Sequence, residues 1–128
     1  MAKYAFGKTV ATSYEETLER ATAALAAEGF GVLTQIDVAA TLKKKLDKDM
    51  APYMILGACN PQFAHRAIEM EPQIGALLPC NVVVRVEGGR TIVEIMDPNA
   101  VLGLVDNPGV VPVASEVRSR LERVLAAL

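Results

Sequence analysis

Tryptophan is absent from this chain of 128 residues, and aromatic residues fill only 5% of its positions. Hydrophobic residues nevertheless reach 52%, slightly above the share of roughly 45–50% that is usual in globular proteins. The core must therefore be aliphatic, and a chain this apolar is not disordered. The length fits one compact domain, residues 1–128, which needs neither a disulfide nor a metal ion to fold.

The chain also carries little net charge. The net charge is −2 with a pI near 5.4, and the longest basic run, Lys43–Lys45, is followed closely by Asp47 and Asp49. Binding to nucleic acid without sequence preference draws on many basic side chains, each releasing counterions. We therefore expect no nucleic-acid partner and interpret the three lysines as a solvated helix face.

Long apolar runs are missing as well. A secretory leader has an apolar stretch of about 7–15 residues after its basic start, and the N-terminal residues Met1–Lys8 are not followed by one. Nothing approaches the roughly 18 consecutive apolar residues of a membrane helix. The sequence thus predicts a cytoplasmic protein without a membrane partner, in which Cys59 and Cys80 are reduced thiols.

The sequence lacks the motifs by which enzyme classes are usually recognised. Gly29-Phe30-Gly31 and Gly88-Gly89 do not continue into the glycine spacing and helix start that hold a pyrophosphate. The chain has a single histidine, His65, and no Ser-His-Asp arrangement is recognisable. The sequence therefore identifies no catalytic residue and no cofactor. It leaves open whether the protein is an enzyme and favours a protein without enzymatic activity.

What the sequence does contain is regular periodicity. Alternating or continuous apolar residues predict five strands, at Tyr4–Val10, Phe30–Ile36, Tyr53–Cys59, Cys80–Val86 and Arg90–Met96. Helical spacing and cap residues predict helices from Ser13 to Gly29, over Val38–Leu46 with Leu42 and Leu46 inward, from Pro61 to about Met70, and from about Pro112 to Leu128.

This order of elements predicts an α+β fold. Two glycines at 88–89 make a tight hairpin, and the long helices are separated from it along the chain. We expect a mainly antiparallel five-stranded sheet with two long helices on one face. The alternative is a parallel βαβ arrangement, which requires Tyr53–Cys59 and Cys80–Val86 to run in the same direction.

Two similar Cys-Asn pairs are the main candidate site. Cys59 and Asn60 end one predicted strand, and Cys80 and Asn81 begin another. If the two strands are antiparallel neighbours, both thiols lie at the same edge of the sheet. Such a pair could be redox-active or bind a soft metal such as Cu(I), whereas the simpler interpretation is two small buried hydrophobic residues.

Other polar residues are weaker candidates. His65 could complete a Cys-Cys-His metal site, but it shares a helix face with Glu69 and should be exposed. Asp37, Asp97 and Asp106 stand between predicted elements, where aspartate usually caps a helix or builds a turn. A paired-carboxylate site is the alternative for these three.

The segment Val101–Val113 is unusually apolar for a connection and is broken only by Asp106-Asn107-Pro108-Gly109. It should not remain in water. The sequence leaves two explanations open: the segment packs on its own core, or it forms the patch through which a homodimer assembles.

Four blocks together resemble the domain of unknown function 302 family: Glu28–Thr34, Ile55–Pro61, Leu77–Val84 and Leu102–Pro108. The resemblance covers essentially the whole chain. It implies a sheet backed by two long helices, in an arrangement similar to the TATA-binding-protein fold, and a dimer. It implies no settled activity and no catalytic residue, and a likeness to a DNA-binding fold does not carry DNA binding.

Three functions stay open on the sequence alone. The leading hypothesis is a non-enzymatic homodimer that binds a small ligand or a metal ion near Cys59, Asn60, Cys80 and Asn81, with the two thiols as metal ligands and His65 as a weaker third. The second is a thiol-dependent enzyme or redox relay that uses one cysteine as nucleophile. The third is a structural or interaction module.

Overall fold

The computed structural model describes residues 2–128. The strands are β1 (Ala5–Val10), β2 (Gly31–Asp37), β3 (Tyr53–Cys59), β4 (Cys80–Glu87) and β5 (Arg90–Met96). The helices are α1 (Tyr14–Ala27), α2 (Val38–Leu46), α3 (Pro61–Met70), α4 (Pro98–Val101) and α5 (Val110–Ala126), with the 3₁₀ turns η1 (Pro72–Leu77) and η2 (Leu102–Leu104). All five predicted strands and the four predicted helices are present, with shifts of a residue or two at their ends.

The five strands form one sheet in the order β1-β5-β4-β3-β2, and every neighbouring pair is antiparallel. The α+β prediction is therefore confirmed. The parallel alternative is wrong, because β3 and β4 run in opposite directions with Ala58 paired to Cys80.

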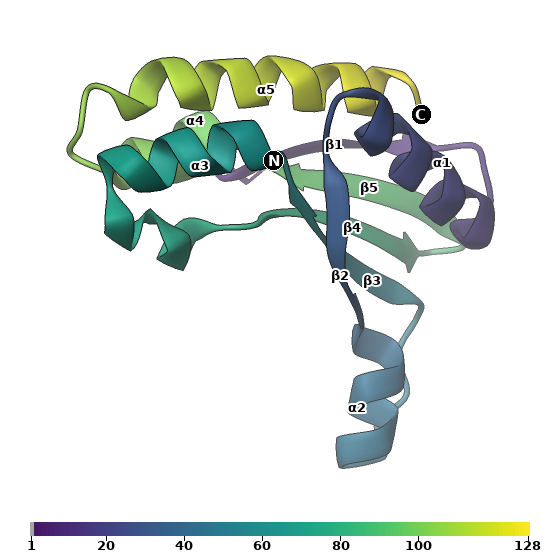
Figure 1. The fold of residues 1–128 in the computed structure, drawn as a ribbon. Helices are drawn as coiled ribbons and strands as arrows, with labels where there is room; N and C mark the ends of the chain where they lie inside the picture. The colour runs from purple at the N-terminus through teal and green to yellow at the C-terminus, as the bar shows by residue number, and fades with distance from the viewer. Residues whose placement is uncertain (1) are drawn as a thin grey trace.

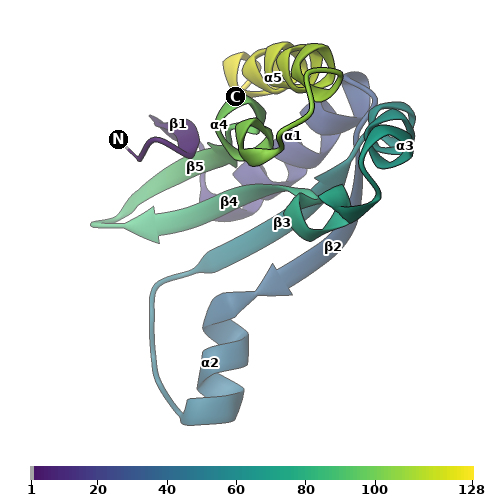
Figure 2. The same cartoon turned by 90° about the vertical axis from the view of Figure 1, so that its left-hand side faces the viewer.

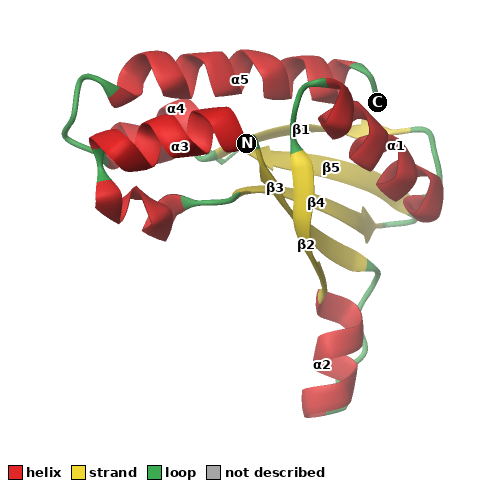
Figure 3. Cartoon of the chain, in the orientation of Figure 1, coloured by secondary structure: helices red, strands yellow, loops and turns green. Residues whose placement is uncertain are grey.

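Helices α1, α3, α4 and α5 all lie on one face of the sheet (Figure 1, Figure 3). The periodicity of β3 and β4 explains which face they cover: Leu56, Ala58, Val82 and Val84 are buried beneath the helices, whereas Asn81 and Glu87 are exposed. The helical layer is wider than the two long helices that the sequence predicted, since α3 and α4 join it.

The core between these layers is aliphatic, as the composition requires. Its fully buried side chains include Leu25 of α1, Leu56 of β3, Ile95 of β5 and Leu121 of α5. Phe30 and Phe63 are the only buried aromatic residues among residues 2–128. Both lie at the end of the sheet where β3 meets α3, which places them at the site described below.

Side chains cap the helices where the sequence predicted. The Ser13 hydroxyl accepts a hydrogen bond from the Glu16 amide at 3.1 Å, and Asp37 accepts one from the Ala40 amide at 2.9 Å. Asp97 accepts from the Asn99 amide at 2.9 Å and so caps α4. Asp106 is exposed, and its neighbour Asn107 makes the hydrogen bonds of that turn instead.

Most of Val101–Val113 packs on the protein's own core. Leu102, Val110 and Val113 are buried, because α4, η2 and the start of α5 fold over the sheet. Of its large apolar side chains, only Leu104 and Val111 remain largely exposed, at 78% and 62%. Packing on the protein's own core, the first of the two explanations, therefore accounts for most of this segment.

Helix α2 stays outside the helical layer. It extends beyond the ends of β2 and β3, away from the rest of the molecule (Figure 1, Figure 2), and none of its residues is buried. Leu42 is half-buried, but Leu46 is 62% exposed, so the prediction that Leu46 faces inward is wrong. We call residues 38–50, which comprise α2 and the segment after it, the arm.

Truncating a core leucine tests the packing. We expect Leu121→Ala to lower the free energy of unfolding by about 2–5 kcal/mol, because it leaves a cavity beneath α5. The matched substitution Leu104→Ala removes the same atoms from an exposed position and should change it by less than about 0.5 kcal/mol. Urea unfolding measures both, and equal effects would contradict the assignment of the core.

Candidate functional site

The antiparallel pairing of β3 with β4 brings the two Cys-Asn pairs to one end of the sheet. Ala58 is opposite Cys80 and Gly57 is opposite Asn81, so Cys59 lies one position beyond the last pair. Cys80 is buried and Cys59 is half-buried, and both are free thiols. The spatial condition that the sequence hypothesis set for the two thiols is met.

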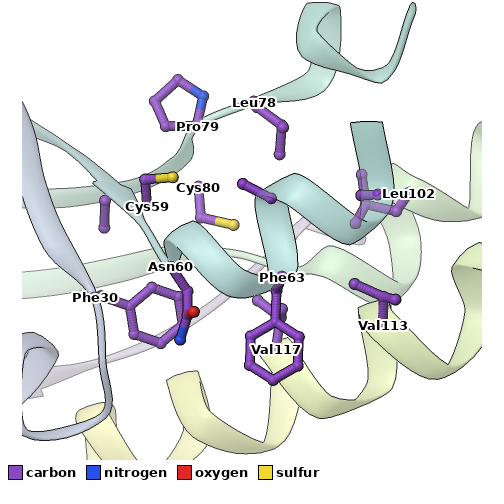
Figure 4. A pocket seen from close by; sticks show the side chains of 13 residues that line it. Phe30, Cys59, Asn60, Phe63, Leu78, Pro79, Cys80, Leu102, Val113 and Val117 are labelled. Atoms are coloured by element: carbon purple, nitrogen blue, oxygen red, sulfur yellow. The ribbon is translucent and has the colours of Figure 1, made fainter. Parts of the chain in front are cut away.

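A small pocket opens beside these two cysteines, between the end of the sheet and helices α3 and α5. Its volume is about 30 Å³. Both sulfur atoms turn towards it in Figure 4. The lining is almost wholly apolar and consists of Phe30, Ala58, Cys59, Asn60, Phe63, Ala64, Ala67, Leu78, Pro79, Cys80, Leu102, Val113 and Val117.

Of the four predicted site residues, three line this pocket and one does not. Asn81 is exposed and pairs with Gly57, and by strand alternation its side chain leaves the sheet on the face opposite to that of Cys80. A one-residue step along a strand reverses the direction of the side chain, which is why adjacency to Cys80 in sequence does not place Asn81 in the pocket.

Asn60 is only 8% exposed and stands at the N-cap position of α3, but its side chain makes no capping hydrogen bond. Its Nδ2 instead donates to the carbonyl oxygen of Glu28, at a long 3.5 Å. Asn60 therefore connects α3 to the turn between α1 and β2. Gly29 fits this turn because its φ is +86°, and a Cβ there would come within 3.0 Å of the Asn60 amide nitrogen.

Arg120 of α5 strengthens the same junction. Its Nη1 donates to the carbonyl oxygen of Glu28 at 3.0 Å, and its guanidinium lies 5.1 Å from the centre of the Phe63 ring. The backbone of Glu28 thus receives hydrogen bonds from both α3 and α5. This arrangement holds the wall of the pocket that Phe30 and Phe63 provide.

The environment keeps both thiols protonated. Burial raises the pKa of Cys80 from 9.0 to about 12, with a smaller contribution from the negative charge that Cys59 would carry. Burial also raises the pKa of Cys59. The N-terminus of α3 does not outweigh burial, so at neutral pH both side chains are neutral thiols.

Metal-ligating side chains do not gather here. In residues 2–128 no three His, Cys, Asp or Glu side chains are placed to hold a metal ion together. His65 is exposed on α3, where its Nε2 lies 2.9 Å from Glu69, and it does not line the pocket. The site thus offers at most two thiols to a metal.

The sequence identified the cysteines but missed most of the pocket. Phe63, Leu78 and Val117 line the pocket, although nothing in the sequence marks them as site residues. The lining comes from strand ends, two helices and a 3₁₀ turn that are distant in the chain. No local spacing marks such a set, and none marks Arg120 as a residue that supports the pocket.

Fold and site together define a class of protein: a small α+β domain in which one helical layer closes an apolar pocket against an antiparallel sheet. The chain belongs to the family described as "Domain of unknown function DUF302", whose model matches residues 6–128. It is similar to the crystal structure of an uncharacterized conserved DUF302 protein from Bacillus stearothermophilus, with 34% identity, 98% of each chain covered and a TM-score of 0.92.

No curated protein matches the chain. The resemblance stated from the four sequence blocks is thus confirmed, and neither comparison assigns a ligand, a partner or an activity. No helix within residues 2–128 is both long and apolar enough to cross a membrane.

The buried thiol has a measurable effect on stability at alkaline pH. Because the pKa of Cys80 is raised in the folded state, the folded protein keeps a proton that the unfolded chain loses above pH 9.0. The free energy of unfolding should therefore fall by about 1.4 kcal/mol per pH unit from this group, between pH 9.0 and about 12.

Cys80→Ala should remove that slope, and the comparison of the variant with the wild type cancels the titration of lysines and tyrosines. Urea unfolding at a series of pH values measures it. A wild type and a variant with parallel pH profiles would show that Cys80 is not held as a neutral thiol.

Proposed function

We propose that this protein is a small-ligand binding module whose pocket, beside Cys59 and Cys80, receives the apolar end of a small organic molecule. The observation that carries the proposal is the lining itself: it joins residues of β3, α3, β4 and α5 around a space that is left unfilled. Protein interiors are close-packed, so an unfilled apolar space at the end of a sheet is unusual.

The size of the pocket limits its occupant. A cavity needs about 10–15 Å³ to admit one water molecule, and this one has about 30 Å³. It thus holds the terminal two or three heavy atoms of a chain or the edge of a ring. Cys59, Leu78 and Pro79 are only partly buried, so the remainder of the ligand would leave the pocket past these residues.

The chemistry of the lining favours an uncharged group. The thiols are neutral, and Asn60 is the only other polar lining residue. A thiol-dependent enzyme or redox relay would need a thiolate near neutral pH, and the raised pKa of both cysteines is evidence against that hypothesis. An interaction module would not require the pocket.

A homologous series of straight-chain alcohols, from ethanol to hexanol, tests the proposal. We expect amide chemical shifts to move at the pocket, at Ala58, Phe63 and Leu102. The dissociation constant should fall about fourfold for each methylene that enters the pocket, because burying one contributes about 0.8 kcal/mol. It should then level off once the cavity is full.

A pair of matched variants controls for binding elsewhere. Ala64→Leu fills the pocket and should weaken hexanol binding by at least about tenfold, since its larger side chain takes the ligand's place. Ala126→Leu makes the same change at an exposed position of α5 and should leave binding unchanged. Equal binding by the two variants would overturn the proposal.

A soft metal ion is the second candidate. The specific observation in its favour is that the two sulfurs share one pocket, where burial and, to a smaller extent, the negative charge that Cys59 would carry raise the pKa of Cys80. A Cu(I) ion between two thiolates would relieve that repulsion and replace the protons.

Anaerobic titration with Cu(I) tests this candidate. The expected result is one bound ion per chain in the wild type and a loss of binding in both Cys59→Ser and Cys80→Ser. Retention of the ion by either single variant, or failure of the wild type to bind it against a competing chelator, would exclude the two-thiol site.

A further inference from the structure

Strand β2 forms one edge of the sheet, and its backbone is open to a further strand. In the order β1-β5-β4-β3-β2 it pairs with β3, and no other strand among residues 2–128 lies on its outer side (Figure 2). The arm leaves this side free, because α2 extends beyond the end of β2 rather than along it (Figure 1). In an edge strand every second residue turns its N–H and C=O groups away from the sheet. The edge of β2 is thus a row of unpaired donors and acceptors.

The residues of β2 do little to protect this edge. Natural edge strands often carry lysine or proline, which keep other chains from pairing with them, as Lys8 does in β1 at the opposite edge. β2 contains neither, and its one charged residue, Asp37, caps α2. Leu33 is 68% exposed and Ile36 48%. A bulge interrupts the edge before Thr34, and the stretch Thr34–Asp37 beyond it pairs regularly with β3.

A shallow hollow, which we call the α1–β2 hollow, follows the same edge. Its volume is about 600 Å³, and it lies between helix α1 and Gln35 of β2. The α1 wall is apolar at Leu18, Ala23 and Ala26. A strand that paired with β2 would run alongside this wall, with every second side chain turned towards the hollow.

One end of the α1–β2 hollow is acidic. Glu15 and Glu19 line it near the start of α1, and Glu15 also lies close to Asp37 at the end of β2. Neither glutamate takes part in an ion pair within residues 2–128. Burial, and then the negative charges of Asp37 and Glu15, raise the pKa of Tyr14 between them. A positively charged side chain would fit this end of the hollow.

We infer that an extended segment of a partner protein adds to the sheet as a further strand beside β2, with lysine or arginine at the end that reaches Glu15 and Glu19. Every pair of neighbouring strands in this sheet is antiparallel, and the added segment continues that pattern. Its basic residues therefore come first in its own sequence, opposite the end of β2. Backbone hydrogen bonds supply the affinity, and the wall of α1 selects the side chains.

This interaction is independent of the proposed ligand site. The α1–β2 hollow and the pocket beside Cys59 and Cys80 share no lining residue. A partner strand on β2 and a small molecule in the pocket could therefore be bound at the same time.

A pair of N-methylated peptides tests the backbone pairing. The parent peptide is as long as β2, has capped ends, and consists of two lysines followed by alternating valine and threonine. Methylation of alternate backbone nitrogens removes either the N–H groups that bond to β2 or those that point away from it. We expect one methylated peptide to bind like the parent and the other at least about tenfold more weakly, because it loses hydrogen bonds. Fluorescence anisotropy of labelled peptides measures both.

Charge reversal tests the acidic end. Glu15→Lys with Glu19→Lys should weaken binding of the parent peptide at least about tenfold, and a peptide with glutamates in place of its two lysines should bind this variant again. The control, Glu69→Lys with Asp106→Lys, makes the same change of charge on α3 and in the turn before α5, and should leave binding unchanged. All four side chains are exposed, so circular dichroism should show folded variants.

Hydrogen exchange locates the bound peptide, since amide exchange should slow at alternate residues of Thr34–Asp37. Four outcomes would overturn the inference: no binding to the wild type at millimolar peptide, equal binding of the two methylated peptides, an affinity that the reversal on α1 leaves unchanged, or slowed exchange confined to other elements. A peptide affinity that falls as the protein concentration rises would assign the edge to a second copy and overturn it too. None of these results depends on whether the pocket binds a ligand.

Discussion

Antiparallel hydrogen bonding between β3 and β4 joins two segments that α3 and η1 separate in the chain. The register of this pair sets Ala58 against Cys80, and strand alternation then sends Leu56, Val82 and Val84 into the core. The same register leaves α3 starting directly beyond the end of β3. The pocket exists because the helix that begins there and α5 cross the sheet end without filling the space beside Cys80.

The position of the pocket between the sheet end and two helices also explains the chemistry of the site. A thiol at the start of a helix, as Cys59 is, could have been an activated nucleophile, since helix N-termini favour negative charge. Here the surrounding side chains are aliphatic and aromatic, and burial decides the balance in favour of the neutral thiol. The site is suited to apolar contact, and its two sulfur atoms are the groups to which a soft metal ion would bind.

Much of the fold was predictable because it depends on local patterns. Ser13, Asp37 and Asp97 cap helices as expected, and Gly88-Gly89 turns the β4–β5 hairpin with positive φ at both residues. Tertiary contacts decided the rest. Val101–Val113 is apolar because it covers its own core, and Leu46 follows helical spacing yet remains exposed because α2 lies outside the helical layer.

The candidate site was predictable only in part, for the same reason. The thiols were found from two short repeated motifs, and the register of two strands brought them together. Strand alternation sends the side chain of Asn81 to the face opposite to that of Cys80, so the Cys-Asn motif does not place both residues in the pocket. The apolar lining was hidden among ordinary core positions, because a residue that lines a void and one that fills it have the same spacing.

The central claim is that a ligand enters the space beside the two thiols. Intermolecular nuclear Overhauser effects between hexanol and the methyl groups of the protein test it most directly, because they report contact within a few ångströms. The account predicts contacts from the alcohol's terminal methyl to Leu102, Val113 and Val117. Contacts confined to other surfaces, such as the shallow surface hollow that Leu18 and Ala23 of α1 line beside β2, would contradict it.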